Sequence, residues 1–216
     1  SELINAIFFA HQGNRMLPSR AGRTTMCPTE LMYDPSKPPN IALLPIETRE
    51  TGTSVSVCKE NPGAWTVLPL ATASPNALQE TLHSVSEVRR VPRKVAEKLG
   101  FDEEDATPVG AIEDDEVEIP RWRHAVINYP HPLLQQGLVI LDTPGLNAIG
   151  AEPELTLSLL PSAHAILFIL AADTGARQSA LAVWKQPIGS GGNSNRGRIV
   201  VLNKIDGLWD GLKSEM

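Results

Sequence analysis

The sequence predicts an α/β fold with a mainly parallel sheet and helices on both of its faces. From residue 137 onward, apolar strands alternate with helical segments in the order strand, helix, strand, helix, strand. Continuous apolar strands are typical of parallel sheets, because the connecting helices bury both faces of the sheet. The chain has 216 residues, which is the size of one such domain or of a large part of one.

The first quarter of the chain is expected to contain a short helix and two strands. Apolar side chains recur at helical spacing from Ser1 to Ala10, and a loop follows from Gly13 to Pro28. We expect one strand over Ile41 to Pro45. A second is expected over Thr53 to Cys58, where valine alternates with polar residues.

The middle of the chain is predicted to form an amphipathic helix followed by an acidic loop. Apolar residues recur every three or four positions from Ala77 to Leu99, and Pro92 should kink or restart this helix. Nine of the 25 acidic residues lie between Asp102 and Glu118, with no basic residue among them. We therefore expect an exposed loop there.

The remaining elements are the strands of the predicted sheet and the helices that connect them. Each of the last strands is short and apolar, as expected for a buried position. The strands are expected over Val117 to Asn128, Gly137 to Leu141, His164 to Ala171 and Arg198 to Leu202, with helices over Glu152 to Leu160 and Ala176 to Lys185.

Charge and cysteine content exclude several classes of protein. The formal net charge is −6, and no concentrated basic face is present, so we expect no binding to nucleic acid. Cys27 and Cys58 are too few for a disulfide scaffold and lack metal spacing, which indicates reduced thiols and a cytoplasmic location. The longest apolar stretch, from Ala163 to Ala172, is too short to span a bilayer.

Two polar motifs begin where apolar strands end. They are DTPG at residues 142–145 and NKID at residues 203–206. In an open parallel sheet, ligands bind at the carboxyl ends of the strands, so both motifs are expected to face one crevice.

The DTPG motif has the chemistry of a metal and phosphate site. A carboxylate such as that of Asp142 can hold Mg²⁺, a hard cation that prefers oxygen ligands. Gly145 has no side chain, so its backbone amide can approach a terminal phosphate closely. The alternative is a plain turn, because proline and glycine both suit turn positions.

The NKID motif has the chemistry of a guanine site. The carboxylate of Asp206 can accept hydrogen bonds from both the ring N–H and the exocyclic amine of guanine, whereas adenine offers no matching donors. Asn203 can tie this loop to its neighbours, and the stem of Lys204 can cover the base. The alternative is a charged helix cap after a strand.

The loop between Leu17 and Pro28 contributes a third element. Together with the two motifs it resembles the dynamin superfamily of large GTPases, in particular the bacterial dynamin-like proteins. The resemblance covers Ser1 to about Trp209, whereas Pro62 to Ile119 match nothing in the family. The matching segments, in chain order, are INAIF, MLPS, GRTT, CPTEL, DTPGLN and LNKID.

The resemblance implies a role for each matched position. Thr25 would be the catalytic switch threonine, binding Mg²⁺ and positioning the attacking water, with Thr24 as the competitor for this role. Asp142 would bind Mg²⁺ through water, and Gly145 would contact the γ-phosphate. The residues that read guanine would be Asn203, Lys204 and Asp206.

The sequence departs from the family at its start. The family has a phosphate-binding loop, G-x-x-x-x-G-K-S/T, before its first helix, and this chain has none. SELINA aligns with the residues that follow G-K, so Ser1 would be the S/T of this loop, binding both Mg²⁺ and phosphate. We therefore expect residues 1–216 to be an incomplete P-loop NTPase-like GTPase domain. It would carry an insertion at about residues 62–119, and lack the phosphate loop and first strand before residue 1 and the remainder after residue 216.

The resulting hypothesis is a GTP-binding and Mg²⁺-dependent GTP-hydrolysing domain of a dynamin-like protein. The resemblance implies that two such domains pair across the nucleotide face as a homodimer, and that regions absent here couple this switch to self-assembly and peripheral membrane association. These 216 residues alone are expected to bind GTP weakly and to be inactive. Two alternatives remain, namely a guanine-nucleotide-sensing scaffold without significant hydrolysis and a small GTPase of translation or ribosome assembly.

Overall fold

The computed structural model describes residues 2–13, 15–17, 27–72, 74–101, 107–108, 115–143, 163–171, 197–203 and 205. The chain divides into two compact units, Ser1–Ala151 and Glu152–Met216. Each unit is described by itself.

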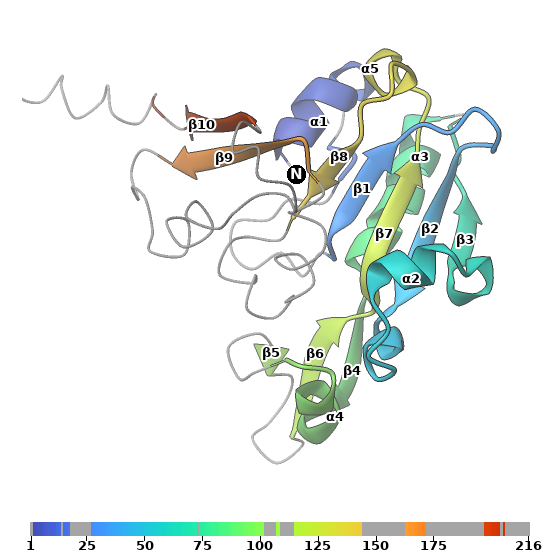
Figure 1. The fold of residues 1–216 in the computed structure, drawn as a ribbon, viewed down its shortest axis with the longest axis vertical. Coiled ribbons are helices and arrows are strands. Elements are labelled where there is room, and N and C mark those ends of the chain that lie inside the picture. The colour runs from blue at the N-terminus through green and yellow to red at the C-terminus, as the bar shows by residue number, and fades with distance from the viewer. Residues whose placement is uncertain are drawn as a thin grey trace, which may run out of the picture. The chain divides into compact units, whose positions relative to one another are not determined.

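A five-stranded sheet forms the centre of the first unit (Figure 1). Strand β1 pairs in parallel with β7, whereas the β1–β8, β2–β7 and β2–β3 pairs are antiparallel. The sheet is therefore mixed, and the predicted predominance of parallel pairs is not confirmed in the described residues of this unit. In the order in which the strands lie, the sheet contains β3 (Thr66–Pro69), β2 (Asn40–Pro45), β7 (Trp122–Asn128), β1 (Thr29–Met32) and β8 (Ile140–Asp142).

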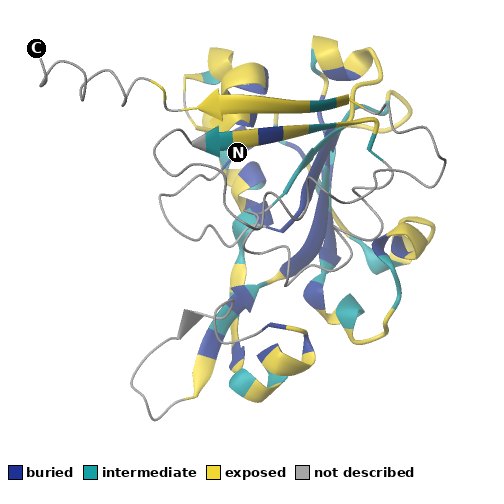
Figure 2. Cartoon of the chain, turned by 60° about the vertical axis from the view of Figure 1, so that its left-hand side comes forward, coloured by how far each residue is buried: buried dark blue, intermediate teal, exposed yellow. Residues whose placement is uncertain are grey.

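One face of this sheet carries the main hydrophobic core. Register partners point to the same face, so Leu31, Ile41 and Ile127 lie side by side there. Helices α1 (Glu2–Phe8) and α3 (Pro75–His83) contribute further buried apolar side chains to the same cluster. The predicted N-terminal helix is confirmed as α1, which is followed by the 3₁₀ turn η1 (Ala10–Gln12). Figure 2 shows buried residues along the central strands of this sheet.

The opposite face is partly covered by helix α2 (Val55–Lys59), where the sequence predicted a strand. That prediction is wrong for a local reason. The hydroxyl of Ser54 accepts a hydrogen bond from Val57 N and caps a helix, which buries Val55 and Cys58 against Leu44 while Val57 stays exposed. A 3₁₀ turn, η3 (Pro62–Ala64), then leads into β3.

The predicted long helix over Ala77 to Leu99 is interrupted by a strand. Helix α3 is followed by the 3₁₀ turn η4 (Ser84–Ser86), the strand β4 (Val88–Pro92) and a second helix, α4 (Arg93–Lys98). Pro92 restarts the helix as predicted, because it ends β4 at the N-cap of α4. The valines before it were spaced like a helix, but their branched side chains also favour strands.

Strand β4 belongs to a second sheet of three strands. It pairs with β6 (Glu116–Pro120), which also pairs with β5 (Thr107–Pro108), and every pair is antiparallel. Figure 1 shows α4 beside β4 and β6. A separate core fills the space between them and the 3₁₀ turn η2 (Ile46–Arg49), and it contains Ile46, Val91, Ala96, Leu99, Phe101, Val117 and Ile119.

The acidic segment and the strand after it differ from the prediction. Glu116 and Glu118 lie in β6, while residues 102–106 and 109–114 lie outside the described part of the chain. The single strand expected over Val117 to Asn128 is two strands, because β6 pairs with β4 and β5 in the three-stranded sheet, whereas β7, which begins after Arg121, pairs with β1 and β2 in the five-stranded sheet.

The strand expected over Gly137 to Leu141 is present but shorter. An unpredicted helix, α5 (Pro132–Gln135), precedes it, with His131 Nδ1 accepting from Leu133 N as the cap. Gly137 then adopts φ +88°, a conformation that glycine tolerates without strain, and β8 begins at Ile140.

The described part of the second unit is a pair of parallel strands, β9 (Ala165–Ala171) and β10 (Gly197–Asn203). Both strands were predicted from their apolar runs, and parallel pairing was expected. The helices predicted over Glu152 to Leu160 and Ala176 to Lys185 lie outside the described residues. Among the described helices, none has the length and apolar character needed to cross a membrane.

Candidate functional site

The structure describes two of the predicted site residues, Asp142 and Asn203, which lie in different units. The other predicted site residues lie outside the described part of the chain, and they are Ser1, Thr24, Thr25, Gly145, Lys204 and Asp206. The structure therefore describes Asp142, Asn203 and the segments that adjoin the other predicted residues in the sequence.

Asp142 lies at the end of β8, directly beside β1. Strand β1 follows the loop between Leu17 and Pro28 that carries Thr24 and Thr25, which is called the threonine loop below. Its register partner on β1 is Thr29, the first residue of that strand. Neighbouring strands lie about 4.8 Å apart, so the backbone of Asp142 is close to the end of the loop. The carboxylate predicted to bind metal and the segment carrying Thr24 and Thr25 are thus attached to adjacent strands.

The C-terminal end of the threonine loop is held against strand β7 of the first unit by a backbone hydrogen bond. Ala125 N donates a hydrogen bond of 2.9 Å to Pro28 O, and Thr29 Oγ1 donates one of 2.9 Å to Cys27 O. Cys27 is buried, and its thiol donates a hydrogen bond of 3.6 Å to Val85 O. Burial raises the pKa of Cys27 to about 12, so this thiol stays protonated and serves packing.

The N-terminal end of the same loop is fixed by a side chain, that of Asn5 on α1. Its Oδ1 atom accepts from Met16 N at 3.1 Å and from Leu17 N at 2.8 Å, and its Nδ2 donates to Leu17 O at 2.9 Å. Met16 and Leu17 are themselves fully buried. Asn5 stands in the INAIF segment that the sequence matched to the family, but spacing alone indicated no role for it.

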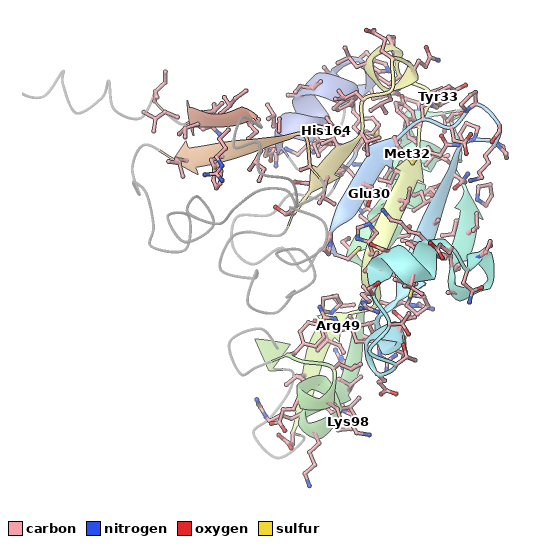
Figure 3. All side chains as sticks on the ribbon, viewed as in Figure 1. Glu30, Met32, Tyr33, Arg49, Lys98 and His164 are labelled. Atoms are coloured by element: carbon pink, nitrogen blue, oxygen red, sulfur yellow. The ribbon has the colours of Figure 1, made fainter. Side chains whose placement is uncertain are left out.

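A buried charged cluster on β1 was also not predicted from the sequence. Glu30 Oε1 accepts from Lys59 Nζ, which comes from α2, and lies 3.1 Å from His124 Nε2 on β7. Figure 3 labels Glu30 on β1. His124 is fully buried, its ring is edge-on to Trp65, and its Nδ1 has no hydrogen-bond partner among the described residues.

The electrostatics of Glu30 follow from these contacts. Burial alone would raise the pKa of its carboxyl group, but the hydrogen bonds and positive charges of His124 and Lys59 outweigh burial and lower the pKa to about 2. Glu30 is therefore ionised at neutral pH and holds α2 on the sheet. Its side chain points to the face opposite that of Thr29, because successive strand residues alternate.

An open cleft of about 380 Å³ lies where the two sheets of the first unit meet. Two of its residues, Arg89 and Arg121, are paired with the carboxylates of Glu47 and Glu87. None of the predicted site residues lines this cleft, and its described lining consists of Pro45, Glu47, Thr66, Arg89, Arg121 and Trp122.

In the second unit, the start of the NKID motif lies at the carboxyl end of a strand, as predicted. Asn203 is the last residue of β10, and its register partner is Ala171, the last residue of β9. The two strands are parallel, so their carboxyl ends lie at one edge. This is the edge of a parallel sheet where ligands bind.

Two comparisons with known proteins match this chain, and one of them covers most of its length. The sequence model of a family described as "Dynamin family" matches residues 1–205. A protein described as "Bacterial dynamin-like protein" from Nostoc punctiforme (strain ATCC 29133 / PCC 73102) is 47% identical over 53 residues. That match covers 24% of this chain and only 8% of the Nostoc protein.

Proposed function

The chain belongs to the dynamin family, and on that premise we propose that it is the GTP-binding and GTP-hydrolysing domain of a dynamin-like large GTPase. The observation that carries this proposal is the pairing of β1 with β8. This pairing places Asp142 opposite Thr29, four residues from Thr25. A carboxylate at the end of one strand and a threonine loop that leads into the neighbouring strand support a metal-assisted phosphate site, in which Mg²⁺ is held by an Asp and a Ser or Thr.

The available donor atoms fit Mg²⁺. The carboxylate of Asp142 and the hydroxyl groups of Ser1 and Thr25 are oxygen donors, which this hard cation prefers. Asp142 is half-buried at a strand end, so a water molecule can lie between its carboxylate and a cation. When bound, Mg²⁺ would neutralise charge on the phosphates of GTP.

The chain's own residues have separate tasks in this proposal. Thr25 is the catalytic residue and holds the attacking water, with Thr24 as the alternative. The backbone amide of Gly145 contacts the γ-phosphate, and Ser1 contacts the phosphates together with a loop upstream of it. Phosphoryl transfer depends on positioning and charge stabilisation more than on covalent chemistry, and each of these contacts would contribute to one or the other.

Guanine recognition is assigned to the second unit. Asn203 lies at the carboxyl end of β10, which supports a ligand-facing position for Lys204 and Asp206 just after it. The carboxylate of Asp206 would accept two hydrogen bonds from guanine, and a bidentate charge-assisted contact of this kind is specific.

For the whole protein, we propose a nucleotide-driven switch. Loss of the γ-phosphate would remove the contacts of Thr25 and Gly145 and change the order of both loops. We further propose that two such domains pair through their nucleotide faces, and that the switch drives self-assembly and membrane remodelling by a cytoplasmic protein peripheral to a membrane. GTP and GDP are the proposed ligands, and nucleic acid is not a partner.

The experiment is a comparison of GTP hydrolysis and GTP binding by the full-length protein and its Thr25→Ala variant, with and without Mg²⁺. We expect Mg²⁺-dependent phosphate release, and a loss of at least about 100-fold in kcat with a much smaller loss of affinity in the variant. Equal turnover of both proteins would contradict the role of Thr25, and Thr24→Ala would then be the variant to test. Tight binding of GTP without turnover by the wild type would instead support a nucleotide-sensing scaffold.

A further inference from the structure

We propose that Asn5 is a positioning residue for GTP hydrolysis. Its side chain holds the first residues of the threonine loop against α1. This inference rests on the proposed function. It concerns a residue that would touch neither nucleotide nor metal and would act through Met16 and Leu17.

The contacts of Asn5 involve both the carbonyl oxygen and the NH₂ group of its side chain. The carbonyl oxygen accepts two backbone amides, those of Met16 and Leu17, and the NH₂ group donates to the carbonyl of Leu17. Asn5 is only 7% exposed, so water does not replace these bonds easily. Removal of the side chain would leave three backbone groups without their partner, which is costly for groups shielded from water.

The two ends of the threonine loop are held in different ways. At the C-terminal end, Pro28 and Thr29 are held by β1 and its pairing with β7, which is a backbone interaction. At the N-terminal end, Met16 and Leu17 lie outside any strand and are buried in the main core, and their backbone is held by the side chain of Asn5, which is eleven and twelve residues away in sequence. Gln79 on α3 adds one bond of 2.7 Å to Arg15 O.

The same helix connects this anchor to the predicted phosphate site. Asn5 lies about one helical turn after Glu2, the first residue of α1, and Ser1 directly precedes Glu2 in the sequence. The anchor therefore fixes the start of the threonine loop to the helix that follows the residue expected to bind Mg²⁺. Loss of the anchor would release Leu17 and reduce the fraction of molecules in which Thr25 is correctly placed.

This placement predicts a specific kinetic effect in the full-length protein. Asn5→Ala should lower kcat for GTP at least about tenfold, with little change in the Kd for GDP, because guanine is read by residues of the second unit. Asn5→Asp should recover part of this rate, since a carboxylate still accepts from the amides of Met16 and Leu17 although it cannot donate to Leu17 O.

Asn128→Ala provides the matched control. Asn128 is also a buried asparagine, 4% exposed, and it closes the β1–β2 loop by accepting from Asp34 N and donating to the carbonyls of Asp34, Lys37 and Pro38. Asn128 is the last residue of β7 and lies opposite Met32, at the other end of β1. Asn128→Ala should lower the Tm as Asn5→Ala does but leave kcat unchanged. An equal kcat in all variants, or an equal fall in both alanine variants, would overturn the proposal.

Limited proteolysis gives a readout that does not depend on GTP hydrolysis. The threonine loop contains two trypsin sites, Arg20 and Arg23. We expect trypsin to cleave at these sites several-fold faster in Asn5→Ala than in the wild type or Asn128→Ala, with the new ends identified by mass spectrometry. If the wild type does not hydrolyse GTP, the proposed function fails while this assay still tests the anchor. An unchanged rate of cleavage in Asn5→Ala would overturn the proposal that Asn5 anchors the threonine loop.

Discussion

At the scale of single residues, Glu30 shows how this fold accommodates a buried charge. Its carboxylate is shared by Lys59 from α2 and His124 from β7, so one anion connects a helix to two strands. A buried ion is tolerated only when it is paired and hydrogen-bonded, and both conditions hold here. Removal of the anion should therefore cost more than removal of a surface charge.

Glu30→Gln should lower the free energy of unfolding by about 1–3 kcal/mol near pH 7, because the amide keeps the shape but loses two charge-assisted bonds. The pKa of Glu30 falls from 4.5 to about 2 on folding. The carboxylate therefore contributes stability that is fully present above pH 4.5 and is lost as the pH falls toward 2. Urea unfolding at a series of pH values should show that the difference in free energy of unfolding between the wild type and Glu30→Gln becomes smaller as the pH falls from 4.5 toward 2.

The control for Glu30 is Asp34, a partly exposed carboxylate at the surface that is paired with Lys37 at 3.1 Å. Asp34→Asn removes the same kind of charge at the surface, where solvent screens the pair, so it should shift the unfolding midpoint little. A smaller effect from Glu30→Gln than from Asp34→Asn, or a difference independent of pH, would contradict the role assigned to the buried cluster.

At the scale of elements, α2 and β4 show why local patterns misled the prediction. Valine alternates with polar residues before Cys58, as in a strand, yet the cap at Ser54 and the burial of Val55 and Cys58 three residues apart establish a helix. In β4 the reverse holds, since valines at helical spacing pair with β6 instead. A local helix cap decided the first case and tertiary pairing decided the second, and single-sequence periodicity records neither.

Ser54→Ala tests whether the cap establishes α2. Loss of the hydroxyl removes the bond from Val57 N, so we expect destabilisation by about 1 kcal/mol in urea unfolding. Ser56→Ala is the matched control, because Ser56 is exposed within the same helix and alanine has the higher helix propensity. Equal effects of the two substitutions would mean that the cap does not stabilise this helix.

At the scale of the whole molecule, the sequence predicted the strand ends that carry the motifs better than the sheets to which those strands belong. Asp142 and Asn203 lie at the last positions of β8 and β10, where apolar runs indicated that strands end. The anchor at Asn5 and the cluster at Glu30 were not predicted, because each depends on hydrogen bonds between segments far apart in sequence. Such contacts leave no periodic pattern along the chain.

The family and the arrangement of the motifs together predict a guanine-specific nucleotide site, and base selectivity tests this most directly. The measurement is the affinity of the full-length protein and its Asp206→Asn variant for GTP, ATP and xanthosine triphosphate. We expect the wild type to prefer GTP. The variant should lose at least about tenfold in GTP affinity and gain affinity for xanthosine triphosphate, because an amide can donate to the oxygen that replaces the exocyclic amine of guanine. Unchanged preference for GTP in the variant, or a wild type that does not distinguish GTP from ATP, would contradict the proposal.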